Sequence, residues 1–184
     1  MKIRFTIFDD AELKAMSAEE FDSNGEGLYG YFEISFGGHA EGQYYDFDIS
    51  EELVGGEALE YWFSSLLKVL HLFQKKKANY AAMRVIEYVD RWIEIKKIHN
   101  KVCLNVARAS DPRERESLLL TSQLYDPVYE SPLDTIEDYD SFYKEIVRAA
   151  TAFLDEIKKF NPDLIKVWEF VTVENSLHEL EQER

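Results

Sequence analysis

Two segments of the chain place their apolar residues at the spacing of an α-helix. In the first, which follows Gly55-Gly56, these residues form one broad stripe: Leu59, Trp62, Phe63, Leu66, Leu67, Leu70 and Phe73. The second extends over residues 141–160, and Asn161-Pro162 ends it. A shorter helix is expected from Pro162 onward, with one side buried: Leu164, Ile165, Trp168 and Val171. The charged tail from about residue 176 is expected to fray.

Most of the remaining chain alternates apolar with polar residues, or is rich in β-branched and aromatic residues, as strands are. Strands are expected over residues 2–8, 28–36, 43–49, 80–89, 92–98, 101–109 and 118–125. Residues 11–21 form either a short helix or an irregular crossover, and residues 126–132 form a loop. This order predicts a single α+β domain over residues 1–184. An antiparallel sheet would have two long amphipathic helices packed on one face and a shorter C-terminal helix.

A glycine-rich loop over residues 37–42 joins the second and third expected strands into a hairpin. Pairing Phe36 with Gln43 across this loop collects the apolar residues on one face, whereas a slip by one residue mixes the two faces. The apolar face then holds Phe32, Ile34, Phe36, Tyr45 and Phe47. The opposite face holds Tyr31, Glu33, Ser35, Tyr44, Asp46 and Asp48.

Three carboxylates lie close together in this register, because Glu33 is opposite Asp46 and Asp48 is diagonal to both. Like charges at this spacing favour a cation, and three interpretations are open. The face is solvated and screened by a basic residue of a neighbouring strand, or it binds a metal ion. Alternatively it binds a basic protein, with Tyr31 and Tyr44 as rigid contact residues.

A second acidic group precedes the helix expected from Ser141, and it consists of Asp134, Glu137, Asp138 and Asp140. Negative charge is favourable at a helix N-terminus, so helix initiation explains this group. The alternative is that it adds contact surface for a basic partner.

The charge of the chain narrows the choice of partner. The formal net charge is −15, from 36 acidic and 21 basic residues. Such a balance repels nucleic acid and anionic membrane surfaces and favours basic partners. The single cysteine, the lack of a signal-peptide pattern and the lack of a long apolar stretch indicate a cytoplasmic protein.

The motifs in the chain do not combine into a catalytic site. A G-x-G-x-x-G pattern at residues 25–30 leads into a strand rather than a helix, so it does not predict a nucleotide site. No zinc-binding H-E-x-x-H or C-x-x-C pattern occurs, and Cys103 is expected to be a small packing residue. No cofactor is expected. The weak candidates for a metal or a reaction are His39, Glu41, Asp46 and Asp48.

We therefore expect a protein-binding module rather than an enzyme, with a basic protein as its partner and its oligomeric state left open. Bacterial immunity proteins are similar in general character, being small, acidic, α+β and non-catalytic, which suggests an inhibitor that neutralises a basic toxin or enzyme. The expected contact residues are Glu33, Tyr31, Tyr44, Asp46, Asp48, Asp134, Glu137 and Asp138. The alternatives are a small metal-dependent enzyme that uses the glycine-rich hairpin loop, and a structural or oligomeric protein without catalytic activity.

Overall fold

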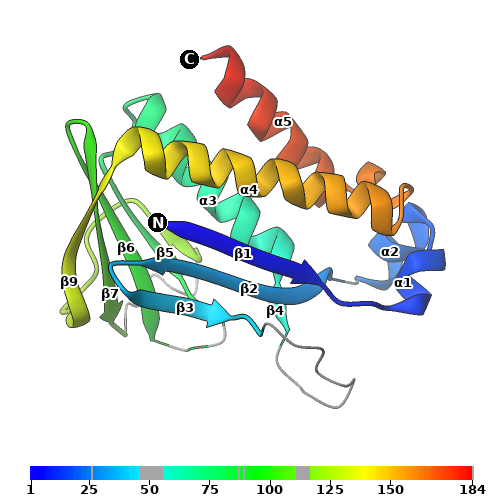
Figure 1. Ribbon diagram of the computed structural model, residues 1–184, viewed down its shortest axis with the longest axis horizontal. Coiled ribbons are helices and arrows are strands. Elements are labelled where there is room, and N and C mark those ends of the chain that lie inside the picture. Colours follow the sequence, from blue (N-terminus) through cyan, green and yellow to red (C-terminus); the bar gives the residue numbers. More distant parts are fainter. Residues whose placement is uncertain (26, 46–55, 87, 89, 111–116, 184) are drawn as a thin grey trace.

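The computed structural model describes residues 1–184 except residues 26, 46–55, 87, 89, 111–116 and 184. Two antiparallel sheets, two long helices and a C-terminal helix make up most of the fold (Figure 1). The α+β class and the packing of the helices against antiparallel strands are as the sequence pattern predicts. The strands before the first long helix and those after it form two separate sheets, where the pattern predicted one.

The N-terminal third of the chain forms the first sheet. Its strands are β1 (Lys2–Ile7), β2 (Tyr29–Phe36), β3 (His39–Gln43) and β4 (Glu57–Ala58). β2 pairs with each of the other three strands. The connection between β1 and β2 forms two short helices, α1 (Ala11–Ala15) and α2 (Ala18–Asn24). Asp10 caps α1, and Ser17 and Glu20 form a capping box at the start of α2.

The second sheet has the strand order β8-β5-β6-β7-β9. Its strands are β5 (Tyr80–Arg84), β6 (Arg91–Ile98), β7 (Lys101–Arg108), β8 (Leu119–Leu120) and β9 (Val128–Asp138). The loop expected up to residue 132 is wrong, because β9 begins at Val128 and pairs with β7. The register jumps between Leu104 and Val106, so β9 bulges at this point. A bulge breaks the two-residue alternation by which a strand is recognised in a sequence.

The helices are α3 (Leu59–Gln74), α4 (Tyr139–Phe160) and α5 (Trp168–Gln182), with a 3-10 turn, η2 (Leu164–Lys166), before α5. α3 and α4 match the two predicted long helices. The last helix starts at Trp168 rather than Pro162, and the segment expected to fray is helical to Gln182. Buried Leu177 and Leu180 hold this segment against the protein.

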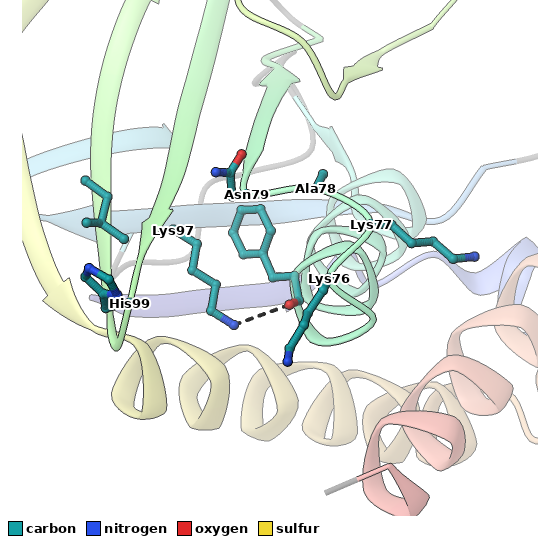
Figure 2. A pocket seen from close by; sticks show the side chains of 8 residues that line it. Lys76, Lys77, Ala78, Asn79, Lys97 and His99 are labelled. Carbon is teal, nitrogen blue, oxygen red and sulfur yellow. Dashed lines mark hydrogen bonds between the residues drawn. The ribbon is translucent and has the colours of Figure 1, made fainter.

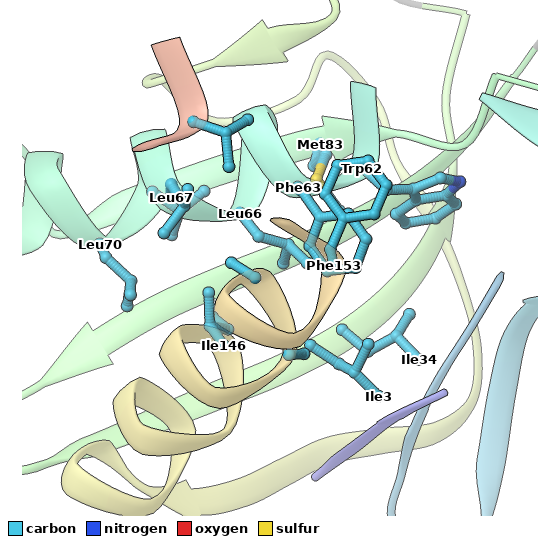
Figure 3. Close-up of a cluster of buried hydrophobic side chains, with 14 of the residues drawn as sticks. Ile3, Ile34, Trp62, Phe63, Leu66, Leu67, Leu70, Met83, Ile146 and Phe153 are labelled. Carbon is cyan, nitrogen blue, oxygen red and sulfur yellow. The ribbon is translucent and has the colours of Figure 1, made fainter. Parts of the chain in front are cut away.

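The main core lies between the helices and both sheets. Figure 3 shows side chains of α3 and α4 converging with Ile3 and Ile34 of the first sheet. Phe63 stacks on Phe153 with ring centroids 4.3 Å apart, which joins α3 to α4. A smaller cluster fills the other face of the second sheet, and its members are Tyr80, Ala82, Trp92, Ala107, Ala109, Leu120 and Leu124. The second sheet is therefore buried on the face toward the helices and partly buried on the other, which we call its outer face.

The hairpin of β2 and β3 has a different register from the one expected. Phe36 pairs with His39 rather than with Gln43, and only Gly37-Gly38 forms the turn. Both glycines have positive φ, 55° and 78°, as a two-residue type I′ turn requires. The expected six-residue loop is wrong because its last four residues belong to β3. Phe32, Ile34 and Phe36 are buried on one face of β2, as predicted.

Candidate functional site

Glu33, the first carboxylate of the acidic cluster expected on the hairpin, is neutralised within the protein. It lies opposite Arg4 of β1, whose Nη2 donates to Glu33 Oε1 and Oε2 at 3.0 and 3.1 Å. The same guanidinium lies over the ring of Tyr44, 4.3 Å from its centroid, and Tyr31 contacts the ring of Tyr45 edge-on. Glu33, Tyr31 and Tyr44 thus lie on one part of the surface with a cation among them.

The two aspartates expected to complete this cluster, Asp46 and Asp48, lie outside the described residues. On this face, the described part of the hairpin therefore presents one paired carboxylate rather than an acidic cluster. The basic residue that screens it comes from the neighbouring strand, which is the arrangement expected of a solvated face.

The residues of the second acidic group have separate contacts inside the fold. Asp138 caps α4 by accepting hydrogen bonds from the backbone N–H groups of Asp140 and Ser141. Glu137 accepts from the N-terminal ammonium at 2.6 Å. Asp134 accepts from the Cys103 thiol at 3.3 Å. Asp138 initiates a helix as predicted, whereas Glu137 and Asp134 are on β9.

His39 and Glu41, the weak candidates for a metal or a reaction, are close together, and Glu41 is only 3% exposed. Arg91 of β6 binds this carboxylate through two hydrogen bonds, Nε to Oε2 at 2.7 Å and Nη2 to Oε1 at 2.6 Å. The Glu41 hydrogen bond is the main factor that raises the pKa of Arg91. This pair links β3 of the first sheet to β6 of the second. Among the residues that the structure describes, no three His, Cys, Asp or Glu side chains could hold a metal ion together.

A second buried carboxylate, Glu94, was not singled out from the sequence. It is 1% exposed and accepts hydrogen bonds from the hydroxyls of Tyr80 and Tyr129 at 2.9 and 3.1 Å. Lys96 forms an ion pair with it at 2.7 Å, and the Asn105 amide donates to it at 3.3 Å. Burial and the charge of Glu94 raise the pKa of both tyrosines. Four donors therefore surround the two carboxylate oxygens of Glu94. On the outer face of the second sheet, this carboxylate ties four strands together and is not accessible to a ligand.

The helix α5 begins with an exposed tryptophan, Trp168, whose exposed fraction is 70%. The sequence pattern placed it on the buried side of the last helix, and this is wrong. Because the helix begins later than expected, Phe170 and Val173 form the buried side instead. A tryptophan left in solvent is an exposed apolar surface that the fold does not use.

Trp168 belongs to what we call the acidic end, which comprises α1, α2 and the first turns of α3 and α5 (Figure 1). The Asn161 amide donates to the carbonyls of Leu13 and Met16, both at 2.8 Å, which fixes α1 against the turn before α5. The ring of Phe21 in α2 contacts that of Phe170 in α5, with centroids 5.9 Å apart. These contacts hold α2 beside the first turn of α5.

The acidic end carries negative charge that the described residues do not neutralise. Lys14 of α1 is already paired with Asp9, and Lys166 of the neighbouring η2 turn is paired with Asp163. No ion pair to a described residue is found for the exposed acids Glu12, Glu19, Asp22 and Glu169.

Glu60, in the first turn of α3, has a largely buried carboxylate in an unfavourable environment. Burial raises its pKa, and the charge of Glu169 raises it further. Its Oε2 is buried and has no hydrogen-bond partner. A cation brought to this point would remove an unfavourable interaction that the free protein retains.

No protein-family model matches this chain, and no curated protein or solved structure matches it either. Among the described residues, no helix is both long enough and apolar enough to cross a membrane.

Proposed function

We propose that the protein is a binding module that docks on a basic surface of another protein through its acidic end. The observation that supports this is the exposure of Trp168 beside carboxylates for which the described residues provide no cation. The proposal keeps the class of partner that the charge of −15 favours. The contact surface expected from the sequence was the β2–β3 hairpin, where Glu33 is already paired with Arg4. The proposal places it at the acidic end instead.

The chemistry of the acidic end suits such a partner. Tryptophan is enriched among the residues that dominate binding energy, and such residues act best when surrounded by groups that exclude water. Trp168 is followed directly by Glu169, and Glu169 is close enough to Glu60 to raise its pKa. Lysine or arginine side chains of a partner would be attracted to both carboxylates while its apolar surface covers the indole. An inhibitor of the immunity type, acting in the cytoplasm on a basic toxin or enzyme, is the form of this function that we favour.

Affinity capture with the purified protein as bait tests the proposal. The bait variants are Trp168→Ala and, as the matched control, Tyr125→Ala, because Tyr125 is 71% exposed but lies in the β8–β9 connection. We expect a basic protein to be retained by the wild type and the control, lost from Trp168→Ala, and released at high salt.

Two outcomes would contradict the proposal. In one, Trp168→Ala retains every protein that the wild type retains. In the other, the retained proteins are acidic or nucleic-acid-bound. A concentration-dependent increase in mass that Trp168→Ala abolishes would instead indicate self-association, which is the structural or oligomeric alternative.

A further inference from the structure

A pocket of about 780 Å³ lies at the C-terminal end of α3, the opposite end of this helix from Glu60. Because α3 has 16 residues, the two ends are about 24 Å apart. The residues that line the pocket come from the end of α3, the segment after it and the β6–β7 turn: Phe73, Lys76, Lys77, Ala78, Asn79, Lys97, Ile98 and His99. We call this the lysine pocket.

The lysine pocket is cationic in a strongly acidic chain. Three lysines and a histidine line it, and no acidic residue does. Figure 2 shows that Lys76 and Lys97 extend to the same side of the pocket, whereas Lys77 points away from them. Burial lowers the pKa of Lys97, and the nearby positive charge of Lys76 lowers it further. The described residues thus bring two ammonium groups together without an anion between them.

Stabilisation of the helix end accounts for only part of this arrangement. The Lys97 ammonium donates to the Phe73 carbonyl at 3.3 Å, and Lys75 pairs with Glu179 and Glu183 at 3.3 and 3.2 Å. Lys76 makes no ion pair with a described residue. Its φ is +53°, in the left-handed region that a lysine rarely adopts.

We propose that the lysine pocket binds a small organic phosphate, with the phosphate between Lys76 and Lys97 and an apolar group against Ile98. Phe73 is buried beneath the pocket, while Ile98 is 57% exposed at its rim. Ammonium groups bind phosphate as point charges, and Asn79 and His99 add hydrogen-bonding groups.

The size and charge of the protein favour a small ligand over a macromolecule. The pocket volume is within the range of small-molecule sites. A nucleic acid or an anionic membrane would bring the whole negatively charged chain against a like-charged surface. This inference does not depend on the proposed function, because the acidic end contributes no residue to the pocket.

Calorimetric titration with phenyl phosphate and with inorganic phosphate tests the assignment. The variants are Lys76→Gln and Lys97→Gln, and the matched control is Lys68→Gln, because Lys68 is an exposed lysine of α3 that does not line the pocket. We expect phenyl phosphate to bind more tightly than inorganic phosphate. Each pocket variant should weaken its binding by about tenfold or more, the effect of losing one charge-assisted hydrogen bond. Lys68→Gln should bind as the wild type does.

Thermal melting of each variant separates lost binding from lost folding. Lys76 is exposed, so Lys76→Gln is expected to melt with the wild type and to remain a valid test if Lys97→Gln is destabilised. No binding to the wild type, or equal weakening by Lys68→Gln, would overturn the assignment. A dimer that Lys76→Gln dissociates would also overturn it, since an acidic surface of a second copy would then be the occupant.

Discussion

The ion pair between Glu41 and Arg91 is expected to hold the two sheets together, and replacing Arg91 by Met tests this. The substitution leaves the Glu41 carboxylate, which is 3% exposed, without its bidentate partner. Removing one member of a buried ion pair costs about 3–5 kcal/mol. The Arg91 side chain is 15% exposed, so the lower part of that range applies.

About 3 kcal/mol corresponds to a melting temperature lower by roughly 6–12 °C in a chain of this size. The matched control is Arg108→Met. Arg91 and Arg108 each pair with Glu130, at 3.0 and 2.7 Å. Arg108 lies opposite Arg91 on β7, but its side chain is 44% exposed. Its loss should cost about 1 kcal/mol or less.

Urea unfolding of the wild type, both single variants and the double variant Glu41→Leu/Arg91→Met would measure these free energies. The double variant removes both charges from the buried position and should lie closer to the wild type than Arg91→Met does. The reasoning is refuted if Arg91→Met and Arg108→Met are equally stable, or if the double variant is the least stable of the four proteins.

Four further variants test three other parts of the structure. Because burial raises the pKa of Glu60, this carboxyl group holds a proton more readily in the folded state than in the unfolded state. The contribution of Glu60 to stability therefore falls as pH rises through its folded-state pKa. Glu60→Gln should therefore raise the melting temperature at neutral pH and lose this advantage in acid. Tyr80→Phe removes the hydroxyl that donates to Glu94 at 2.9 Å and should cost about 1–3 kcal/mol in urea unfolding. Gly37→Ala should lower the melting temperature more than Gly38→Ala does, because the methyl group added at Gly37 collides with the Thr135 hydroxyl, whereas the one added at Gly38 has open space.

The helices could be read from the sequence because each is amphipathic over several turns. α3 and α4 bury the residues that the 3.6-residue period selects, for example Trp62 and Phe153. α5 was placed too early because Pro162 and Asn161 are good residues for a helix start. Asn161 instead uses its amide to hold α1, a contact between residues 148 positions apart that no local pattern contains.

The strands were recognisable, but their partners were not. Alternation within β2 correctly selected Phe32, Ile34 and Phe36 as the buried face, yet the same alternation fits more than one length of turn. The positive φ of Gly37 and Gly38 decides the register, and the sequence could have been read this way because paired glycines suit a two-residue turn.

The candidate site depended on features that the sequence does not carry. The pairing of Glu33 with Arg4 follows from strand register, and the exposure of Trp168 follows from where α5 begins. The composition favours a basic partner over an acidic one, and this remains a prediction. The fold determines which carboxylates are already neutralised and which are left at the surface.

The central claim, that the acidic end binds a basic protein, is tested most directly by calorimetric titration of the captured partner into three proteins: the wild type, Trp168→Ala and Tyr125→Ala. If Trp168 is a dominant contact, its loss should weaken binding by about 30-fold or more, which corresponds to about 2 kcal/mol. Tyr125→Ala should bind as the wild type does. Equal affinities for the wild type and Trp168→Ala would contradict the claim.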